Sequence, residues 1–409
     1  MKKNKAIILN GNLGKYRKGF FYFQPYNGGK QFGCKSSENL DIIWTKDTKE
    51  FVIEESKIIG DKLTIGNCLF DFNSLEITEV NIKGFTQHQK YSLLWYATLD
   101  YVGFYLKNET NIIEGIISLQ IQNILWKREL YSFYKDYSFE ENIIIKVVYL
   151  DGKIDKYGAK GKEKAFLGLQ FLTGETLWQR SFKELGITSL DKFIGDIDNI
   201  LVCACGKTIL GLDKNTGEIH WKLRHRSEAQ YTLLNPSTGC LYQLYGWADS
   251  GSNNSLILLE IDAKTGTILY DKSIFKHPNY QPIDNLGTEQ DWKYPRFHNA
   301  VQWKEKVYFL VNPTGTSWLA NVFEFDCIQK RVTKVSDELY ATTNSIFVAE
   351  GKLFINSEIC KKVASRDNLE NDKWSRAISI PRMDGEKEYS EYYAISKESY
   401  LTIFDLEDN

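Results

Sequence analysis

Short apolar runs separated by tight turns recur along the chain, and the clearest example lies at residues 211–221, Gly-Leu-Asp-Lys-Asn-Thr-Gly-Glu-Ile-His-Trp. One apolar run ends at Leu212, and residues 215–217 supply a turn whose glycine can take a positive φ. On the return strand, Ile219 and Trp221 are two residues apart and are both expected to point inward. The pattern therefore predicts a strand, a tight turn and a second strand.

The same hairpin pattern recurs at residues 169–178 and 261–270. Weaker copies extend it to eight units, which close near residues 44, 80, 126, 178, 221, 270, 335 and 404. In the eighth unit, residues 392–396 and 400–404 are expected to be separate strands. The units repeat about every 50 residues, and a second pair of short apolar runs precedes each hairpin, so each unit predicts about four antiparallel strands.

Four-stranded units at this period predict an all-β protein with a single β-propeller domain over residues 1–409. We expect eight blades, or seven if the N- and C-terminal segments complete one blade jointly. Two β-sandwich domains are the alternative, but a sandwich gives no reason for a repeated Thr-Gly turn followed by Trp. Loop insertions are expected at residues 151–165, 271–298 and 358–389. The first is expected to be a solvated loop, and the last a lid or an unstructured segment.

The pattern Leu-Asp-x-x-Thr-Gly-x-x-x-Trp resembles the repeat of the pyrroloquinoline-quinone (PQQ)-type, quinoprotein-like β-propellers. Trp178 and Trp221 close the best copies, Tyr270 replaces the tryptophan in a third, and Trp44 and Trp126 keep the aromatic residue without Thr-Gly. The resemblance implies that each tryptophan docks against the neighbouring blade and that the glycine makes the turn. It implies a fold, and by itself no chemistry.

For the enzymes of that family, the resemblance would imply a quinone, a calcium ion, a catalytic Asp and, in many, a disulfide between adjacent cysteines. This sequence has no adjacent cysteines, and Cys203 and Cys205 are expected to be buried thiols on one face of a strand. The five histidines show no metal-ligand spacing, and His220 is expected to point away from Trp221. We therefore expect no cofactor, no metal site and no catalytic residue.

Charge and composition limit the class of partner and the cellular compartment that we expect. The chain has 51 Lys and Arg against 53 Asp and Glu, a net charge of −2, so no basic domain attracts nucleic acid or an anionic membrane. No apolar run approaches the roughly 20 residues of a membrane span, and residues 6–9 are too short for a secretory signal. The seven scattered cysteines are typical of reduced thiols. We expect a cytoplasmic protein.

Strand order predicts a binding face. In a four-stranded antiparallel blade, the loop into the first strand and the loop between the second and third strands open on one face. Aromatic loops at residues 247–254, 277–298 and 313–318 fall on that face, and Trp, Tyr and Arg dominate protein interfaces. The predicted partner-binding residues are Trp247, Asp249, Tyr280, Trp292, Tyr294, Arg296, His298 and Trp318. The alternative is that these aromatic residues plug the channel or pack under their own loops.

These observations favour a non-catalytic cytoplasmic β-propeller that binds a protein partner through its loop-rich face. A bacterial immunity or antitoxin protein is a more specific hypothesis within that class. The alternative from another class is a small-molecule or glycan-acting enzyme that uses the propeller channel, with Asp249, Arg296 and His298 as its polar groups. A third hypothesis, an assembly scaffold, is disfavoured by the missing signal sequence.

Overall fold

The computed structural model shows an all-β protein, with no α-helix among the residues it describes. The structure describes residues 2–9, 12–24, 31–38, 41–47, 58–65, 68–80, 91–97, 100–107, 112–121, 123–130, 133–139, 143–151, 153–155, 158–160, 163–227, 229, 232–249, 252–273, 296–312, 319–336, 339–364, 374–384 and 387–406. Within these ranges, no helix is long and apolar enough to cross a membrane.

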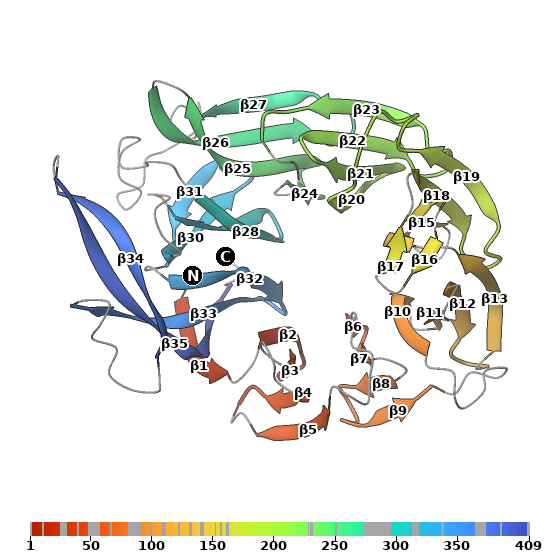
Figure 1. The fold of residues 1–409 in the computed structure, drawn as a ribbon, viewed down its shortest axis with the longest axis horizontal. Coiled ribbons are helices and arrows are strands. Elements are labelled where there is room, and N and C mark those ends of the chain that lie inside the picture. The colour runs from red at the N-terminus through yellow and green to blue at the C-terminus, as the bar shows by residue number, and fades with distance from the viewer. Residues whose placement is uncertain are drawn as a thin grey trace. The chain divides into compact units, whose positions relative to one another are not determined.

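Six separate sheets contain four antiparallel strands each, and neighbours in a sheet follow one another along the chain (Figure 1). The strands of the first three sheets are β2 (Asn12–Arg17), β3 (Phe20–Gln24), β4 (Gln31–Ser36) and β5 (Ile42–Asp47); β6 (Ile58–Ile59), β7 (Lys62–Ile65), β8 (Cys68–Asp71) and β9 (Ile77–Glu79); and β10 (Tyr91–Ala97), β11 (Tyr101–Lys107), β12 (Ile112–Ser118) and β13 (Asn123–Leu130). Those of the next three are β14 (Phe133–Phe139), β15 (Ile143–Tyr149), β18 (Lys164–Gln170) and β19 (Thr176–Ser181); β20 (Lys192–Ile197), β21 (Ile200–Cys205), β22 (Thr208–Asp213) and β23 (Ile219–Arg224); and β24 (Leu233–Asn235), β25 (Cys240–Asp249), β26 (Ser252–Asp262) and β27 (Ile268–Ser273).

A larger sheet has nine strands and contains two further four-stranded groups. One group is β28 (Arg296–Trp303), β29 (Lys306–Asn312), β30 (Leu319–Asp326) and β31 (Arg331–Lys334); the other is β32 (Leu339–Ala349), β33 (Lys352–Val363), β35 (Lys387–Asp405) and β1 (Lys2–Leu9), with β34 (Trp374–Asp384) paired to β35. The two groups are joined where β30 pairs with β32. We call each four-stranded group a blade and name it by its strands; the β32, β33, β35 and β1 group is the terminal blade.

The chain divides into two compact units. The first, which we call the N-terminal unit, contains Arg17–Tyr22 and Lys30–Gln230. The C-terminal unit contains Met1–Tyr16, Phe23–Gly29 and Tyr231–Asn409. That the whole of residues 1–409 forms a single domain stays a prediction.

The middle strands of the blades form the core. All six residues of β21 are buried, whereas Trp221 is the one buried residue of β23. Ile219, which was expected to face inward, is 40% exposed because it lies at the start of this outer strand. Strands covered on both faces read as continuous apolar runs, which explains the sequence Ile-Leu-Val-Cys-Ala-Cys of β21. Cys203 and Cys205 are buried in this strand, as predicted.

The eighth unit differs from the prediction. Residues 392–396 and 400–404 belong to one strand, β35, and do not form a hairpin. The fourth strand of this blade comes from the other end of the chain, because β1 pairs with β35 from Lys2 opposite Asp405 to Leu9 opposite Ser399. The first and last described strands therefore share one blade, a long-range pairing that local sequence does not encode.

Two predicted insertions also contain regular structure. Within residues 151–165, β16 (Lys153–Asp155) and β17 (Gly158–Lys160) form a small hairpin. Residues 358–389 hold the end of β33, all of β34 and the beginning of β35, so the described part of this segment is a β-ribbon. Residues 274–295, most of the third insertion, lie outside the described residues.

The Thr-Gly turns join the third and fourth strands of the β14–β19, β20–β23 and β24–β27 blades, as expected. Repeated four-stranded antiparallel units of this kind are the blades of a β-propeller. The predicted fold class, an all-β propeller, is confirmed, while the number of blades stays a prediction.

Candidate functional site

The predicted partner-binding residues lie mostly in strands or outside the described residues. Trp247 and Asp249 belong to β25 and pair with Ser255 and Ser252 of β26, so the expected loop at residues 247–254 is largely an extended hairpin. Arg296 and His298 belong to β28, not to the preceding loop, with an irregular register at His298. The sequence missed these strands because polar residues at strand ends resemble a loop. Tyr280, Trp292, Tyr294 and Trp318 lie outside the described residues.

The turn at the opposite end of the blades is built on an aspartate. In the β20–β23 blade, Asp213 Oδ1 accepts hydrogen bonds from the backbone N–H groups of Asn215 and Thr216, at 2.8 and 2.9 Å. Gly217 then takes a φ of 69° and donates its backbone N–H to the backbone carbonyl oxygen of Asp213. Asp71, Asp262 and Asp326 accept the same pair of N–H groups in their own turns. The aspartate is therefore a more persistent signal than Thr-Gly.

Each of two tryptophans docks onto the turn of the next blade. Trp178 donates its indole N–H to the backbone carbonyl oxygen of Lys214 at 2.8 Å. Trp126 donates its indole N–H to the backbone carbonyl oxygen of Phe171 at 2.7 Å. A Cβ atom on Gly217 would lie 2.4 Å from the Trp178 ring, and one on Gly174 would lie 2.5 Å from the Trp126 ring. The contact implied by the family resemblance is therefore present at both positions.

A second glycine, which the sequence analysis missed, faces the tryptophan from its own blade. Gly168 pairs with Trp178 and Gly211 pairs with Trp221. Added Cβ atoms would lie 2.3 and 2.5 Å from the respective rings. The indole of Trp178 thus lies between Gly168 and Gly217, and the recurring Leu-Gly-Leu of the third strand is the signal that could have revealed it.

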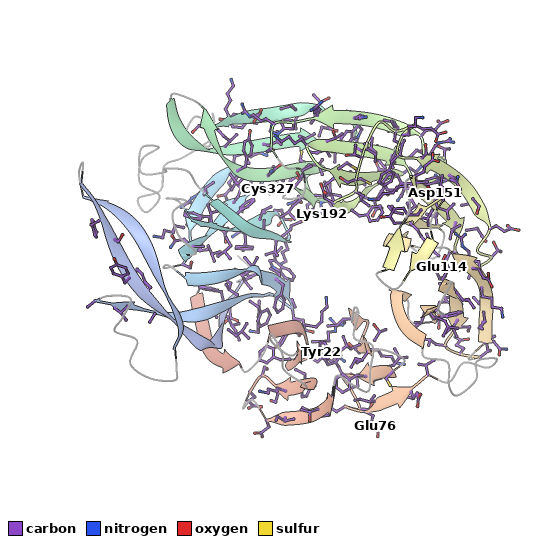
Figure 2. All side chains as sticks on the ribbon, viewed as in Figure 1. Tyr22, Glu76, Glu114, Asp151, Lys192 and Cys327 are labelled. Atoms are coloured by element: carbon purple, nitrogen blue, oxygen red, sulfur yellow. The ribbon has the colours of Figure 1, made fainter. Side chains whose placement is uncertain are left out.

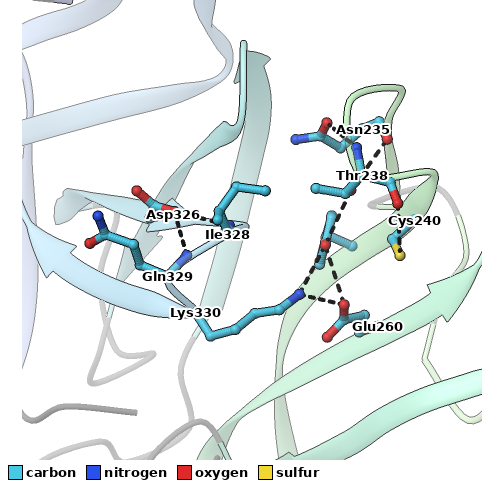
Figure 3. A network of polar contacts seen from close by, with 9 residues as sticks. Asn235, Thr238, Cys240, Glu260, Asp326, Ile328, Gln329 and Lys330 are labelled. Atoms are coloured by element: carbon cyan, nitrogen blue, oxygen red, sulfur yellow. Dashed lines mark hydrogen bonds and ion pairs between the residues drawn. The ribbon is translucent and has the colours of Figure 1, made fainter. Parts of the chain in front are cut away.

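The contact between the β24–β27 blade and the β28–β31 blade replaces this arrangement with charges (Figure 3). Glu260 occupies the place of Gly168, because it pairs with Tyr270, the substitute for the tryptophan. Lys330 occupies the place of Gly217, with a φ of 55°. Its ammonium forms an ion pair with Glu260 and a hydrogen bond of 3.0 Å with the Tyr242 hydroxyl. A buried, charge-assisted contact therefore takes the place of ring packing.

The protonation states in this network indicate structure and not catalysis. Burial raises the pKa of Tyr242 far above its ordinary value, and burial raises the pKa of Cys327 to about 12. Burial also raises the pKa of Cys240. All three groups are therefore protonated at neutral pH, so neither thiol is a ready nucleophile.

A second departure from the repeat creates a cavity in the β28–β31 blade. In the β14–β19, β20–β23 and β24–β27 blades, a one-residue bulge in the fourth strand brings an aromatic residue opposite the third strand. The β30–β31 pairing has no such irregularity, so Thr333 faces Glu324. A cavity of about 420 Å³ lies there, lined by Trp303, Lys304, Glu305, Lys306, Tyr308, Glu324, Asp326, Gln329, Arg331 and Thr333.

The cavity combines a buried polar wall with an exposed charged rim. Glu324 forms an ion pair of 3.0 Å with Lys306. Tyr308 is 2% exposed, and burial, reinforced by the neighbouring Glu324 carboxylate, raises the pKa of its hydroxyl. Lys304 and Arg331 are exposed, and the Lys304 ammonium lies 5.9 Å from the centre of the Trp303 ring. Such a cavity offers hydrogen-bond acceptors and an aromatic surface.

A fully buried carboxylate marks the contact between the β10–β13 and β14–β19 blades (Figure 2). Glu114 forms ion pairs with Arg128 on the adjacent strand, at 3.1 Å, and with Lys146 of the next blade. Burial lowers the pKa of Lys146.

Elsewhere in the described part of the chain, His225 is buried against Ser227 and His220 is exposed, as predicted for His220. No cluster of potential metal ligands occurs among the described residues.

Comparison with known proteins finds similarity of fold only. No family model and no curated protein matches the sequence. Among solved structures, "the eukaryotic initiation factor" is similar with a TM-score of 0.50 and 9% identity, covering 100% of this chain and 91% of the other. This likeness concerns the fold alone.

Two other similar structures have TM-scores below 0.5. BamB from Moraxella catarrhalis has a TM-score of 0.47 and 14% identity, covering 87% of this chain and 96% of the other. Quinohemoprotein alcohol dehydrogenase from Comamonas testosteroni has a TM-score of 0.48 and 9% identity, covering 98% and 76%. The chain is an all-β protein whose repeated four-stranded sheets are the blades of a β-propeller, and its repeats resemble those of the PQQ-type propellers.

Proposed function

We propose that this chain is a non-catalytic β-propeller protein that binds a protein partner through the end of its blades where the second and third strands are joined. The observation that carries the proposal is the difference between the two ends of the blades. At the other end, the third and fourth strands are joined by short aspartate-based turns. At the proposed binding end, the connections in the β14–β19 blade, the β24–β27 blade and the terminal blade contain additional paired strand segments, whereas a tight turn at residues 206–207 joins β21 to β22.

Two of these extensions belong to the C-terminal unit. Among the described residues, β27 pairs with β26 from Ile257 onward, whereas the pairing of β25 with β26 reaches Asp249 opposite Ser252. This hairpin carries Trp247 and Asp249, two of the predicted binding residues. It supports the proposal because connections between strands often carry binding residues.

The larger extension is the terminal ribbon, which we define as residues 360–363, 374–384 and 387–396 (Figure 1). Strand β34 pairs with β35 from Trp374 opposite Ser396 to Asp384 opposite Lys387, and within the described residues no strand pairs with its other edge. Tyr389 is 47% exposed. An edge strand can bind an extended segment of a partner through backbone hydrogen bonds, and Pro381 is typical of such an edge.

The proposal extends to a cytoplasmic location and, in its most specific form, to an immunity or antitoxin role. Six of the seven cysteines are buried and form no disulfide, which supports a reducing compartment; they are Cys34, Cys68, Cys203, Cys205, Cys240 and Cys327. An immunity role would require that the captured partner is a toxin and that the chain blocks its action. Co-expression of the two proteins, with cell growth as the readout, tests this specific form.

The experiment is affinity capture with two matched deletions. Val363 and Tyr392 are cross-strand partners, so joining them through an Asn-Gly turn removes β34 and retains the inner pairs of β33 and β35. The control joins Leu150 to Glu163 in the same way and removes β16 and β17, because these two residues already share a backbone hydrogen bond.

We expect the wild type and the control to capture a protein partner that the ribbon deletion does not capture. The purified partner should bind the wild type again. Normal thermal unfolding of both variants is required for this interpretation. A partner retained by the ribbon deletion would reject the terminal ribbon as its binding site. A tightly bound small molecule or metal with no protein partner would favour the channel enzyme instead.

A further inference from the structure

We propose that the cavity of the β28–β31 blade is a binding site for a flat aromatic ligand of indole size that carries an N–H donor. This inference goes beyond the proposed protein-binding role. The cavity is lined by the β28–β29 hairpin and the β30–β31 turn, which lie at the end of the blade opposite the terminal ribbon.

The other blades show which kind of side chain occupies the corresponding position. The residue opposite the Gly168 position is an aromatic ring in the β14–β19, β20–β23 and β24–β27 blades, namely Trp178, Trp221 and Tyr270. In the β28–β31 blade that residue is Thr333, whose side chain is far smaller than an indole. The open space therefore corresponds to a ring that the sequence does not supply.

The residue that faces the position of the missing ring differs in another blade that also lacks the ring. In the β6–β9 blade, Thr78 occupies the same position without a bulge, but it faces Leu69. Leu69 packs against the core cluster that contains Val102 and Phe104. In the β28–β31 blade the facing residue is Glu324, a polar group drawn toward Lys306, and the space next to it stays open.

The groups around the cavity match an aromatic N–H donor. Glu324 and Asp326 place carboxylates in the wall, and a carboxylate has about four acceptor positions. The Trp303 ring supplies an aromatic surface for edge-to-face or offset packing. At about 420 Å³, the cavity lies within the size range of small-molecule sites, roughly 300–1,000 Å³. Trp178 shows the same pairing of a packed ring with an N–H donated to an oxygen.

The test uses 5-fluoroindole as the probe and fluorine NMR of the ligand as the readout, since the protein itself contains no fluorine. The full chain should broaden and shift the ligand signal in a saturable manner. Thr333→Trp supplies the missing ring and should weaken binding at least about tenfold. Thr333→Val keeps the shape of the threonine and should leave the affinity within about threefold.

Thr333→Tyr serves as a second filled variant if Thr333→Trp fails to fold, because Tyr270 already faces a glutamate in the β24–β27 blade. Absence of saturable binding to the wild type would overturn the proposal. Equal binding to the wild type and to a folded filled variant would place the ligand elsewhere and overturn it as well. Neither result bears on partner capture by the terminal ribbon, so the two proposals fail independently.

Discussion

The indole N–H of Trp178 donates a hydrogen bond to the backbone oxygen of Lys214, 2.8 Å away, and thereby ties one blade to the turn of the next. The contact needs a glycine on each side of the ring, Gly168 and Gly217. A motif that looks like a turn signal in the sequence is therefore also a packing signal. Its importance to stability can be separated from the conformational requirement of the turn.

Gly217→Ala should destabilise the protein more than Gly206→Ala. Both glycines have positive φ, 69° and 62°, so both substitutions carry a conformational cost of about 1 kcal/mol. Only the methyl group at position 217 collides with Trp178, whereas a Cβ on Gly206 meets nothing within 4 Å. We expect a loss of roughly 2–4 kcal/mol for Gly217→Ala, measured by urea unfolding. Equal losses would show that the ring contact contributes little.

Lys330→Met should destabilise the contact between the β24–β27 and β28–β31 blades, because it leaves the Glu260 carboxylate buried without its ammonium partner. Breaking a buried pair from one side typically costs about 3–5 kcal/mol. The double variant Glu260→Gln/Lys330→Met should lose less than the sum of the single variants, with a coupling of about 2 kcal/mol in a double-mutant cycle. Additive losses would mean that the two side chains do not stabilise each other.

Glu114→Gln should be among the most destabilising single changes in the N-terminal unit. Lys146 is fully buried and would lose its carboxylate partner, at a cost of about 3–5 kcal/mol. Glu129→Gln, at an exposed position one residue from Arg128, is the control and should change stability by less than about 1 kcal/mol. The double variant Glu114→Leu/Lys146→Met should recover much of the loss, as judged by thermal unfolding midpoints.

The contribution of Lys192 to the free energy of unfolding should rise with pH between about 8 and 10.5. Burial lowers the pKa of this lysine to about 8, so over this interval the unfolded chain holds the proton and the folded chain does not. The penalty is complete below pH 8 and disappears as the pH passes the unfolded value.

Titrating thiols affect the same interval, so the measurement is the difference between the wild type and Lys192→Met in urea unfolding. We expect this difference to change by about 2 kcal/mol across the interval. Lys207→Met, at an exposed position, is the control. A constant difference would mean that Lys192 remains charged in the folded state.

Local features of the fold were predictable from the sequence, and long-range pairings were not. The hairpin at residues 211–221 was predictable because Asp213 and Gly217 satisfy the turn within five residues. The prediction of separate strands at residues 392–396 and 400–404 was wrong, because both belong to β35 and the fourth strand of this blade is β1. A blade shared by the two terminal segments was the alternative, and the sequence could not decide between the two because the pairing is long-range. Alternating polar residues hid the extended part of β25 and the terminal ribbon, since their sequences resemble loops.

The cavity was not predictable because it depends on register. The sequence shows Thr333 and Lys334 where other units have an aromatic residue, but it does not show which of them faces Glu324. The absence of one bulge decides this, and a shift of one residue reverses the face of every side chain that follows. The predicted binding residues remain a prediction, because four of the eight lie outside the described residues.

The pairing of β1 with β35 has a consequence for synthesis on the ribosome. Lys2 pairs with Asp405, so β1 leaves the exit tunnel long before the strand with which it pairs. At about 5–20 residues per second, translation of the intervening chain takes roughly 20–80 seconds. During that time the backbone N–H and C=O groups of Lys2–Leu9 lack their partner strand, and the central blades would begin to fold without them. A bulky N-terminal fusion should therefore slow the final step of folding more than the formation of the other blades.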